Sequence, residues 1–269
     1  MDIDAVGLDF VEGKQSLSLV KEYGFPKDKL LLAGVVNGKN IWRNHYSRTL
    51  ALLADLKKTG ARIGIGTSCS LLHVPYTVAQ ETKLPEYALK HFSFAEEKLQ
   101  ELRDLSFLFS LENAEPEKIY QVNDALFQSD RIGKNAAVQA EVFALKPDDF
   151  TRFPSFEERE KLQKTRFRLP LFPTTTIGSF PQTAEVRSNR AAFRKNLICG
   201  EQYRQFNFDR IKECISLQEK IGLDVLVHGE FERNDMVEYF GEHLQGFLFT
   251  EKAWVQSYGT RCVRSEEHT

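Results

Sequence analysis

The sequence lacks several features that mark whole classes of protein. No apolar run approaches the roughly 20 residues that a membrane-spanning helix needs. The first ten residues are acidic, without the basic start and apolar stretch of a signal peptide. The 36 basic and 38 acidic residues nearly cancel, so the charge balance gives no sign of a nucleic-acid or membrane partner. These absences predict a soluble cytoplasmic protein with neither kind of partner.

Cysteine is scarce and scattered. Cys69, Cys199, Cys214 and Cys262 include no CxxC pair, so neither a zinc ribbon nor a disulfide framework is indicated. A reducing compartment such as the cytoplasm agrees with this usage. Cys69 and His73 lie four residues apart, but one such pair falls short of the four ligands of a structural zinc site.

Short apolar runs alternate with amphipathic ones in the first part of the chain. The runs at 5–11, 30–36 and 62–68 are predicted to be buried strands. Helices are predicted between them, at 15–23 and around 50–57. Strands that alternate with helices favour a parallel sheet with right-handed crossovers, and continuously apolar strands indicate that both faces of the sheet are covered.

From Pro85 onward the pattern becomes helical. Apolar residues at spacings of three and four predict one long amphipathic helix over 85–110. Further helical segments follow near 115–128, 135–145 and 155–166, and we interpret 113–170 as a mostly helical connector.

The strand–helix pattern returns after Pro170. Residues 174–182 and 224–230 are predicted to be strands, with a helix over 201–221 between them. Residues 246–263 are predicted to form a β-hairpin with the polar residues Thr250, Glu251 and Lys252 near its turn.

A closed (β/α)8 barrel takes about 250 residues, and neither half of the chain is that long. We therefore predict an α/β fold made of two partial TIM-type barrels joined by the connector. The predicted domains are the end of one barrel at 1–112, the connector at 113–170, the beginning of a second barrel at 171–263 and a terminal segment at 264–269.

Candidate chemistry lies where two predicted neighbouring strands end, because ligands of parallel α/β folds gather at the carboxyl ends of strands. The Ser179 hydroxyl and nearby backbone N–H groups suit a carboxylate, and Gly178 lets a ligand approach the backbone closely. Glu230 ends the second strand and suits an ammonium group. The three residues together suit a zwitterionic amino acid, although a turn serine and a surface glutamate explain the same pattern equally well.

Longer motifs surround these residues: TTTIGSFPQT (174–183), DVLVHGEFERNDMVEYFGEHLQGF (224–247) and WVQSYGTRCV (254–263). They resemble the opening of the C-terminal domain of the cobalamin-independent methionine synthase family. LLLAGVVNGKNIW (30–42) and TSCSLLHVP (67–75) resemble the last strands of that family's N-terminal, folate-binding barrel. The resemblance covers 5–263 and is weakest across 113–168.

The resemblance implies two face-to-face barrels, with homocysteine, zinc and methyl-folate meeting at the C-terminal, catalytic one. The implied activity is methyl transfer from 5-methyltetrahydropteroyltri-L-glutamate to L-homocysteine, giving L-methionine, without cobalamin. The implied homocysteine-binding residues are Ile177, Gly178, Ser179 and Glu230. The implied folate-binding residues are Arg261 and Cys262.

The resemblance also implies what this stretch does not supply. In the family a histidine, two cysteines and a glutamate bind zinc, and all four correspond to positions beyond residue 263, as does the histidine that donates a proton. We therefore expect no catalytic residue or metal ligand here and an inactive chain. Residues 264–269 depart from the family, and we predict that they are a non-native tail.

Two other functions remain open at this stage. One is a non-catalytic, barrel-derived interaction protein, and the other is a uroporphyrinogen decarboxylase-like barrel enzyme. Of the remaining conspicuous residues, His228 is expected to pack or form a hydrogen bond, and the stretch around Glu232 and Asp235 is expected to shape the mouth of the site.

Overall fold

The computed structural model describes residues 3–111, 118–128, 135–256 and 262–267. These residues divide into two compact units, of which unit 1 spans 1–135 with 246–269 and unit 2 spans 136–245. Throughout the described part, no helix combines the length and the apolar character needed to cross a membrane.

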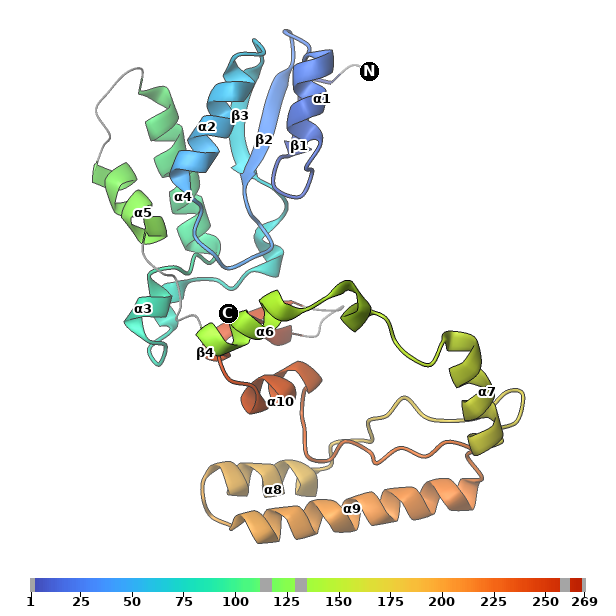
Figure 1. Ribbon diagram of the computed structural model, residues 1–269. Helices are drawn as coiled ribbons and strands as arrows, with labels where there is room; N and C mark the ends of the chain where they lie inside the picture. Colours follow the sequence, from blue (N-terminus) through green and yellow to red (C-terminus); the bar gives the residue numbers. More distant parts are fainter. Residues whose placement is uncertain (1–2, 112–117, 129–134, 257–261, 268–269) are drawn as a thin grey trace. The chain divides into compact units, whose positions relative to one another are not determined.

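Unit 1 is built on a three-stranded parallel sheet in the order β1-β2-β3 (Figure 1). β1 (Ala5–Asp9), β2 (Leu30–Val36) and β3 (Arg62–Thr67) lie where the apolar runs predicted strands. The predicted crossover helices are α1 (Ser16–Tyr23) and α2 (Tyr46–Lys57). The prediction of an α/β fold with a parallel sheet is therefore confirmed.

The core of unit 1 lies between this sheet and its helices. The alternate residues Leu31, Ala33 and Val35 of β2 face this core because successive side chains of a strand point to opposite faces. The buried cluster comprises Val20, Leu31, Ala33, Val35, Leu53 and Leu56. Leu32, on the opposite face of β2, is 44% exposed. Burying each large aliphatic side chain of the cluster contributes about 1.5–3 kcal/mol.

The single long helix predicted after the third strand is wrong, because the structure has two helices there. α3 (Glu86–Leu89) and α4 (Ala95–Ser110) are separated by a segment in which Phe92 and Phe94 are 2% and 0% exposed. Both rings are buried in one cluster, which a continuous helix would not allow. The backbone N–H of Phe94 donates to the Glu97 carboxylate (3.1 Å), so α4 begins with a new cap.

The predicted C-terminal hairpin forms, but its turn lies elsewhere. β4 (Leu248–Gln256) pairs with β5 (Cys262–Glu267) in antiparallel fashion. Thr250, Glu251 and Lys252, which were predicted near the turn, lie inside β4. The residues that join the two strands, 257–261, lie outside the described residues.

Within unit 1, β4 is anchored by one buried carboxylate. Glu81, which is 4% exposed, accepts hydrogen bonds from the backbone N–H groups of Glu251 and Lys252, both at 2.7 Å. The β4–β5 register shifts between Phe249 and Trp254, so these two N–H groups are free of the hairpin ladder and point to Glu81. Glu81 follows two short 3-10 helices, η1 (Leu71–His73) and η2 (Val78–Gln80).

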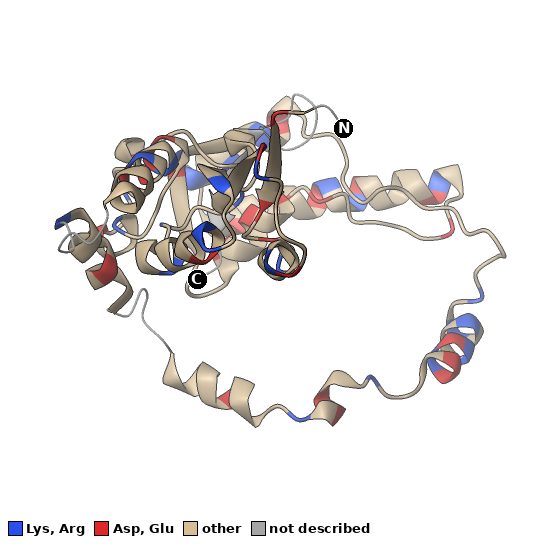
Figure 2. Cartoon of the chain, turned by 90° about the horizontal axis from the view of Figure 1, so that it is seen from above, with Lys and Arg blue, Asp and Glu red and all other residues tan. Residues whose placement is uncertain are grey.

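The predicted connector contributes helices to both units. α5 (Lys118–Gln128) belongs to unit 1, where the Asn123 side chain accepts from the Tyr46 N–H and donates to the Asn44 carbonyl, both at 2.9 Å. α6 (Ala136–Ala144), η3 (Pro147–Phe150) and α7 (Phe156–Phe167) belong to unit 2. Charged residues of both signs cover α7, whereas α6 carries almost none (Figure 2).

The remaining helices of unit 2 are α8 (Ala184–Arg194), α9 (Gly200–Ile221) and α10 (Met236–His243). α8 and α9 pack side by side as a helical pair (Figure 1). The Thr183 hydroxyl caps the start of α8, and Gly222, with a left-handed φ of +85°, ends α9.

The strands predicted at 174–182 and 224–230 are wrong as continuous strands, although the two segments do run side by side. Among the described residues they share one parallel bridge, between Ser179 and Gly229. At their other end the Thr174 carbonyl accepts hydrogen bonds from the next segment.

A side chain replaces part of the missing strand ladder. Gln218 of α9 is fully buried, and its amide contacts both backbone groups of Val227. The Val227 N–H donates to Gln218 Oε1 (2.9 Å), and Gln218 Nε2 donates to the Val227 carbonyl (2.7 Å). At Val227 the second extended segment is thereby tied to α9, whereas on either side of Val227 it is bonded to the first extended segment.

Candidate functional site

The candidate site lies where the two extended segments of unit 2 meet. The backbone N–H of Phe180 donates to the Gly229 carbonyl (2.9 Å), next to the bridge between Ser179 and Gly229. This pairing brings residues 177–179 beside Glu230, as the sequence predicted. We refer to Ile177, Gly178, Ser179 and Glu230, which were predicted from the sequence to bind an amino acid, as the amino-acid clamp.

The tightest approach within the amino-acid clamp is between Gly178 and Glu230. A Cβ atom at Gly178 would lie 2.9 Å from Glu230 Oε1, which is closer than side-chain carbons pack. Gly178 also has a φ of +119°, a conformation that L side chains rarely adopt. The backbone conformation therefore favours glycine here, and a side chain at this position would have to displace the Glu230 carboxylate, which lies over this peptide.

A sharp turn directs the Glu230 side chain toward Gly178. Gly229 and Glu230 both have positive φ values, +91° and +59°. A left-handed glutamate is uncommon and has to be fixed by its surroundings. Gln182 supplies part of that fixation, since its Nε2 donates to the Glu230 carbonyl (3.3 Å).

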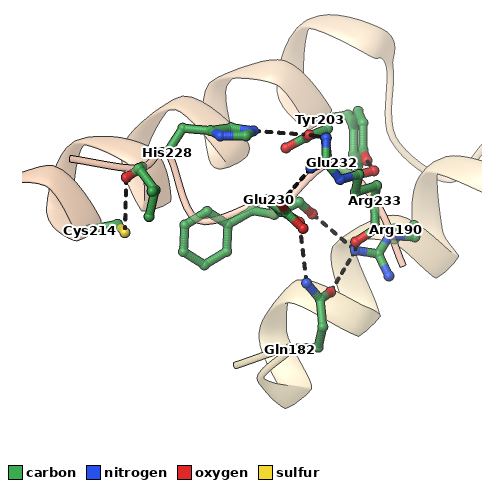
Figure 3. A network of polar contacts seen from close by, with 10 residues as sticks. Gln182, Arg190, Tyr203, Cys214, His228, Glu230, Glu232 and Arg233 are labelled. Carbon is green, nitrogen blue, oxygen red and sulfur yellow. Dashed lines mark hydrogen bonds and ion pairs between the residues drawn. The ribbon is translucent and has the colours of Figure 1, made fainter. Parts of the chain in front are cut away.

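The buried Arg190 of α8 fixes the rest of this turn (Figure 3). Its Nη2 donates to the Phe231 and Arg233 carbonyls, each at 3.0 Å, and to Gln182 Oε1 at 2.6 Å. Nη2 carries two hydrogens, so at least one of them is shared between two of the three acceptors. Arg190 thus connects α8 to both extended segments of the site.

The charged groups at the end of the second segment form one network. Arg233 Nη2 pairs with Glu230 Oε1 at 2.5 Å, and Arg233 Nη1 donates to Glu232 Oε1 at 3.4 Å. His228 Nε2 lies 3.1 Å from the same Glu232 oxygen. The prediction that His228 forms a hydrogen bond is therefore confirmed.

The other half of the amino-acid clamp is open to solvent. Ile177 is 94% exposed and Ser179 is exposed as well. An exposed turn with a hydroxyl group and backbone N–H groups can bind a carboxylate, and the adjacent Glu230 carboxylate can bind an ammonium group. The arrangement therefore offers opposite partners, side by side, for the two charged ends of an amino acid.

A pocket of about 720 Å³ lies next to the clamp in unit 2, lined in part by His228, Glu232, Tyr203 and Asn207. Neither Ser179 nor Glu230 lines it. It is therefore a neighbour of the amino-acid clamp, sharing the charged network with it.

Sequence reasoning missed the three residues that organise the clamp: Gln182, Arg190 and Arg233. Arg233 follows Glu230 by three residues, a spacing that brings side chains together in a turn. Nothing in the sequence marks Arg190, because its three acceptors come from segments that only folding brings together.

The remaining predicted site residues, Arg261 and Cys262, belong to the C-terminal segment of the chain. Arg261 lies outside the described residues, and Cys262 begins β5 in unit 1. In the described parts of the chain, no three His, Cys, Asp or Glu side chains gather in a way that suits a metal ion. Cys69 is a free thiol at the end of the unit 1 sheet.

Two family models match this chain. Residues 172–266 match the model described as "Cobalamin-independent synthase, Catalytic domain", and residues 1–61 match "Cobalamin-independent synthase, N-terminal domain". The first match includes the whole amino-acid clamp and extends into the segment predicted as a non-native tail.

Named relatives agree with these matches. The chain is 59% identical over 261 residues to the 5-methyltetrahydropteroyltriglutamate–homocysteine methyltransferase of Campylobacter jejuni (strain RM1221). It is 55% identical over 264 residues to the protein of that name from Lactococcus lactis subsp. cremoris (strain MG1363). The alignments cover 97% and 98% of this chain but 34% of each relative, so the chain spans about a third of their length. The chain therefore belongs to the cobalamin-independent methionine synthase family and carries parts of both of its domains.

Proposed function

We propose that the amino-acid clamp binds L-homocysteine for methyl transfer from 5-methyltetrahydropteroyltri-L-glutamate, giving L-methionine. The observation that carries the proposal is the Glu230 carboxylate lying over the Gly178 peptide, where a Cβ atom would be 2.9 Å from Oε1. The substrates named for the relatives include an amino acid with both an ammonium and a carboxylate group.

The clamp matches the two charged ends of that substrate. The ammonium group pairs with Glu230, and the carboxylate takes the Ser179 hydroxyl and the backbone N–H groups around Gly178. Hydrogen bonds between charged and neutral groups are about twice as strong as those between neutral groups. The side chain of the substrate, with its sulfur, is then directed away from the clamp.

In the reaction, the homocysteine sulfur attacks the methyl carbon of the folate. The S–C bond forms as the N–CH3 bond breaks, and the folate nitrogen retains the electron pair and takes a proton. A free thiol has a pKa near 8.5, so about a few per cent is thiolate at pH 7. The family resemblance assigns activation of the sulfur to zinc.

The described residues do not fit that metal, because no three suitable ligands come together among them. We therefore assign no step through zinc to this chain. The residues of this chain bind and orient the amino acid. The fold proposed for them is two partial barrels, and the sheet β1-β2-β3 belongs to the first. Arg261 and Cys262 are proposed to contact the folate.

Binding tests this function directly. L-homocysteine and its methylated product L-methionine are titrated into the isotope-labelled 269-residue chain under reducing conditions, and amide shifts are followed by NMR. We expect shifts centred on 177–179 and 229–230. Ser179→Ala and Glu230→Gln should each weaken binding on the order of tenfold, the loss expected for a hydrogen bond to a charged group.

Glu219→Gln is the matched control, because Glu219 is exposed on α9 of the same unit. It should bind like the unchanged chain. Shifts spread evenly over the chain, or an effect of Glu219→Gln equal to that of Glu230→Gln, would refute the clamp and favour a non-catalytic role. Family membership removes the decarboxylase-like alternative.

A further inference from the structure

We propose that Arg233 is a positioning residue of the amino-acid clamp, whose guanidinium fixes one oxygen of Glu230 so that the other faces the ammonium group of the ligand. This inference rests on the proposed function, and it adds a residue that acts through Glu230.

The contacts of Arg233 are those of a group held in one orientation. Its Nη2 lies 2.5 Å from Glu230 Oε1, and its Nη1 lies 3.4 Å from Glu232 Oε1 (Figure 3). The guanidinium carbon is 6.0 Å from the centre of the Tyr239 ring. The Arg233 side chain is 15% exposed, whereas the paired Glu230 side chain is 25% exposed. A guanidinium has its donors in a rigid plane, so contacts on two sides fix its direction.

The backbone of Arg233 is fixed as well. Its carbonyl accepts from the buried Arg190 (3.0 Å), which also binds the Phe231 carbonyl on the other side of Glu232. Both the main chain and the side chain of Arg233 are thus set before any ligand arrives. A binding group that is already ordered does not lose conformational entropy when the ligand binds.

The oxygen that Arg233 contacts is the one that faces Gly178. Glu230 Oε1 pairs with Arg233 and also lies over Gly178. This leaves Oε2 as the acceptor for the ligand. Without Arg233, the glutamate would have several rotamers to choose from, and its ordering on binding would cost free energy.

The charge of Arg233 does not cancel the attraction for an ammonium group. It is shared between Glu230 and Glu232, so Arg233 does not neutralise Glu230 alone. The clamp should therefore bind ligands with an amino group more tightly than ligands without one. Arg233 should determine the size of this difference in affinity.

The test compares L-homocysteine with 4-mercaptobutanoate, which has the same carboxylate and thiol but lacks the amino group. Affinities of the full 269-residue chain are measured by NMR titration for the unchanged protein, Arg233→Gln, Arg233→Lys and Arg204→Gln. Arg204 is the matched control, because it forms an Arg–Glu pair of the same spacing with Glu201 on the exposed surface of α9.

We expect the unchanged chain to prefer L-homocysteine. Arg233→Gln should reduce that preference on the order of tenfold while leaving the affinity for 4-mercaptobutanoate unaltered. Arg233→Lys should retain part of the preference for L-homocysteine, and Arg204→Gln should retain all of it. A purely structural role of Arg233 would lower the affinity for both ligands together, so equal losses of affinity in Arg233→Gln would overturn the proposal. A preference for L-homocysteine that is preserved in Arg233→Gln would overturn it as well.

Failure of the proposed function is a separate outcome. If the unchanged chain binds both ligands equally, Glu230 does not contact the ammonium group, and both proposals are wrong. Circular dichroism checks that each variant is folded. If Arg233→Gln is not folded, the proposal is decided by comparing the ligand preference of Arg233→Lys with that of Arg204→Gln.

Discussion

Gly178 and Glu230, 52 positions apart in the sequence, lie so close that a single carbon atom added to Gly178 would come within 2.9 Å of Glu230 Oε1. The contact joins the end of one extended segment to the end of the next. It combines a backbone able to receive a carboxylate with a carboxylate able to receive an ammonium group.

This contact makes Gly178→Ala a sensitive test. The new methyl group displaces the Glu230 carboxylate, and the φ of +119° strains the backbone by about 1–3 kcal/mol. We expect loss of detectable L-homocysteine binding and a lower free energy of unfolding, measured by NMR titration and urea denaturation. Gly222→Ala separates the two effects, because Gly222 has a φ of +85° but nothing within 4 Å of its Cβ position. It should lose stability and keep binding; if it also loses binding, strain alone explains the result.

Gln218 is predicted to be essential for the stability of unit 2. Gln218→Leu removes the partner of the Val227 N–H and leaves the Val227 carbonyl with only the long contact from Cys214 Sγ (3.8 Å), at a cost of about 2–4 kcal/mol. Urea denaturation measures the loss. Gln205→Leu is the control, since the Gln205 side chain bonds to Asp209 on the exposed face of the same helix. Equal effects of the two substitutions would contradict the role given to Gln218.

The attachment of the β4 strand to unit 1 should depend on Glu81. Glu81→Gln replaces one of two acceptor oxygens by an N–H donor, which faces the backbone N–H of Glu251 or Lys252. Faster hydrogen exchange at these two amides, by about tenfold or more, is the expected result. Glu86→Gln, at an exposed position on α3, should leave both exchange rates unchanged. Unchanged protection in Glu81→Gln would mean that the hairpin ladder alone fixes β4.

Glu101 should give unit 1 a pH dependence that is unusual for a carboxylate. Burial raises the pKa of Glu101 above its ordinary value of 4.5, against the opposing effects of the Asn44 N–H and Lys98. The folded state therefore binds this proton more tightly than the unfolded state does. Its stabilising contribution is full below pH 4.5 and is lost as the pH rises through the folded pKa. Glu101→Gln should abolish this loss, because glutamine retains an acceptor for Asn44 without a charge.

Asp55 should give unit 1 a pH dependence of stability in the opposite direction and serves as an internal comparison. Lys21 and Lys58 lower the pKa of Asp55 to about 2. Its contribution is present above pH 3.8 and is lost as the pH falls toward 2. Urea denaturation across pH 2–8 for the unchanged chain, Glu101→Gln and Asp55→Asn distinguishes the two. A Glu101→Gln profile identical to that of the unchanged chain would contradict the assignment.

The 269-residue chain is expected to show no methyl transfer, because it spans about a third of its relatives and the proposed zinc ligands correspond to the remainder. The measurement is methionine formation from L-homocysteine and the triglutamate donor, with bound zinc quantified in parallel. Turnover above background with about one zinc per chain would show that these residues suffice for the reaction.

Several features follow from the sequence alone. β1, β2 and β3, with α1 and α2 between them, lie where local periodicity placed them, because continuous apolar runs and amphipathic repeats are properties of neighbouring residues. The family, and the positions of Gly178, Ser179 and Glu230 at the ends of two adjacent segments, were likewise readable from short motifs.

Long-range contacts decided the rest. The helical pattern around Phe92 and Phe94 is broken because both rings are buried in a cluster that includes Ile41 and Ala253 from distant segments. Val227, in the middle of the second extended segment, is bound by the Gln218 side chain rather than by a strand, a choice that backbone propensity does not reveal. Arg190 became part of the site only because folding brought three acceptors from two separate segments to one guanidinium. Sequence periodicity reports which surfaces need burial, whereas the partners of buried polar groups are determined by which distant segments meet.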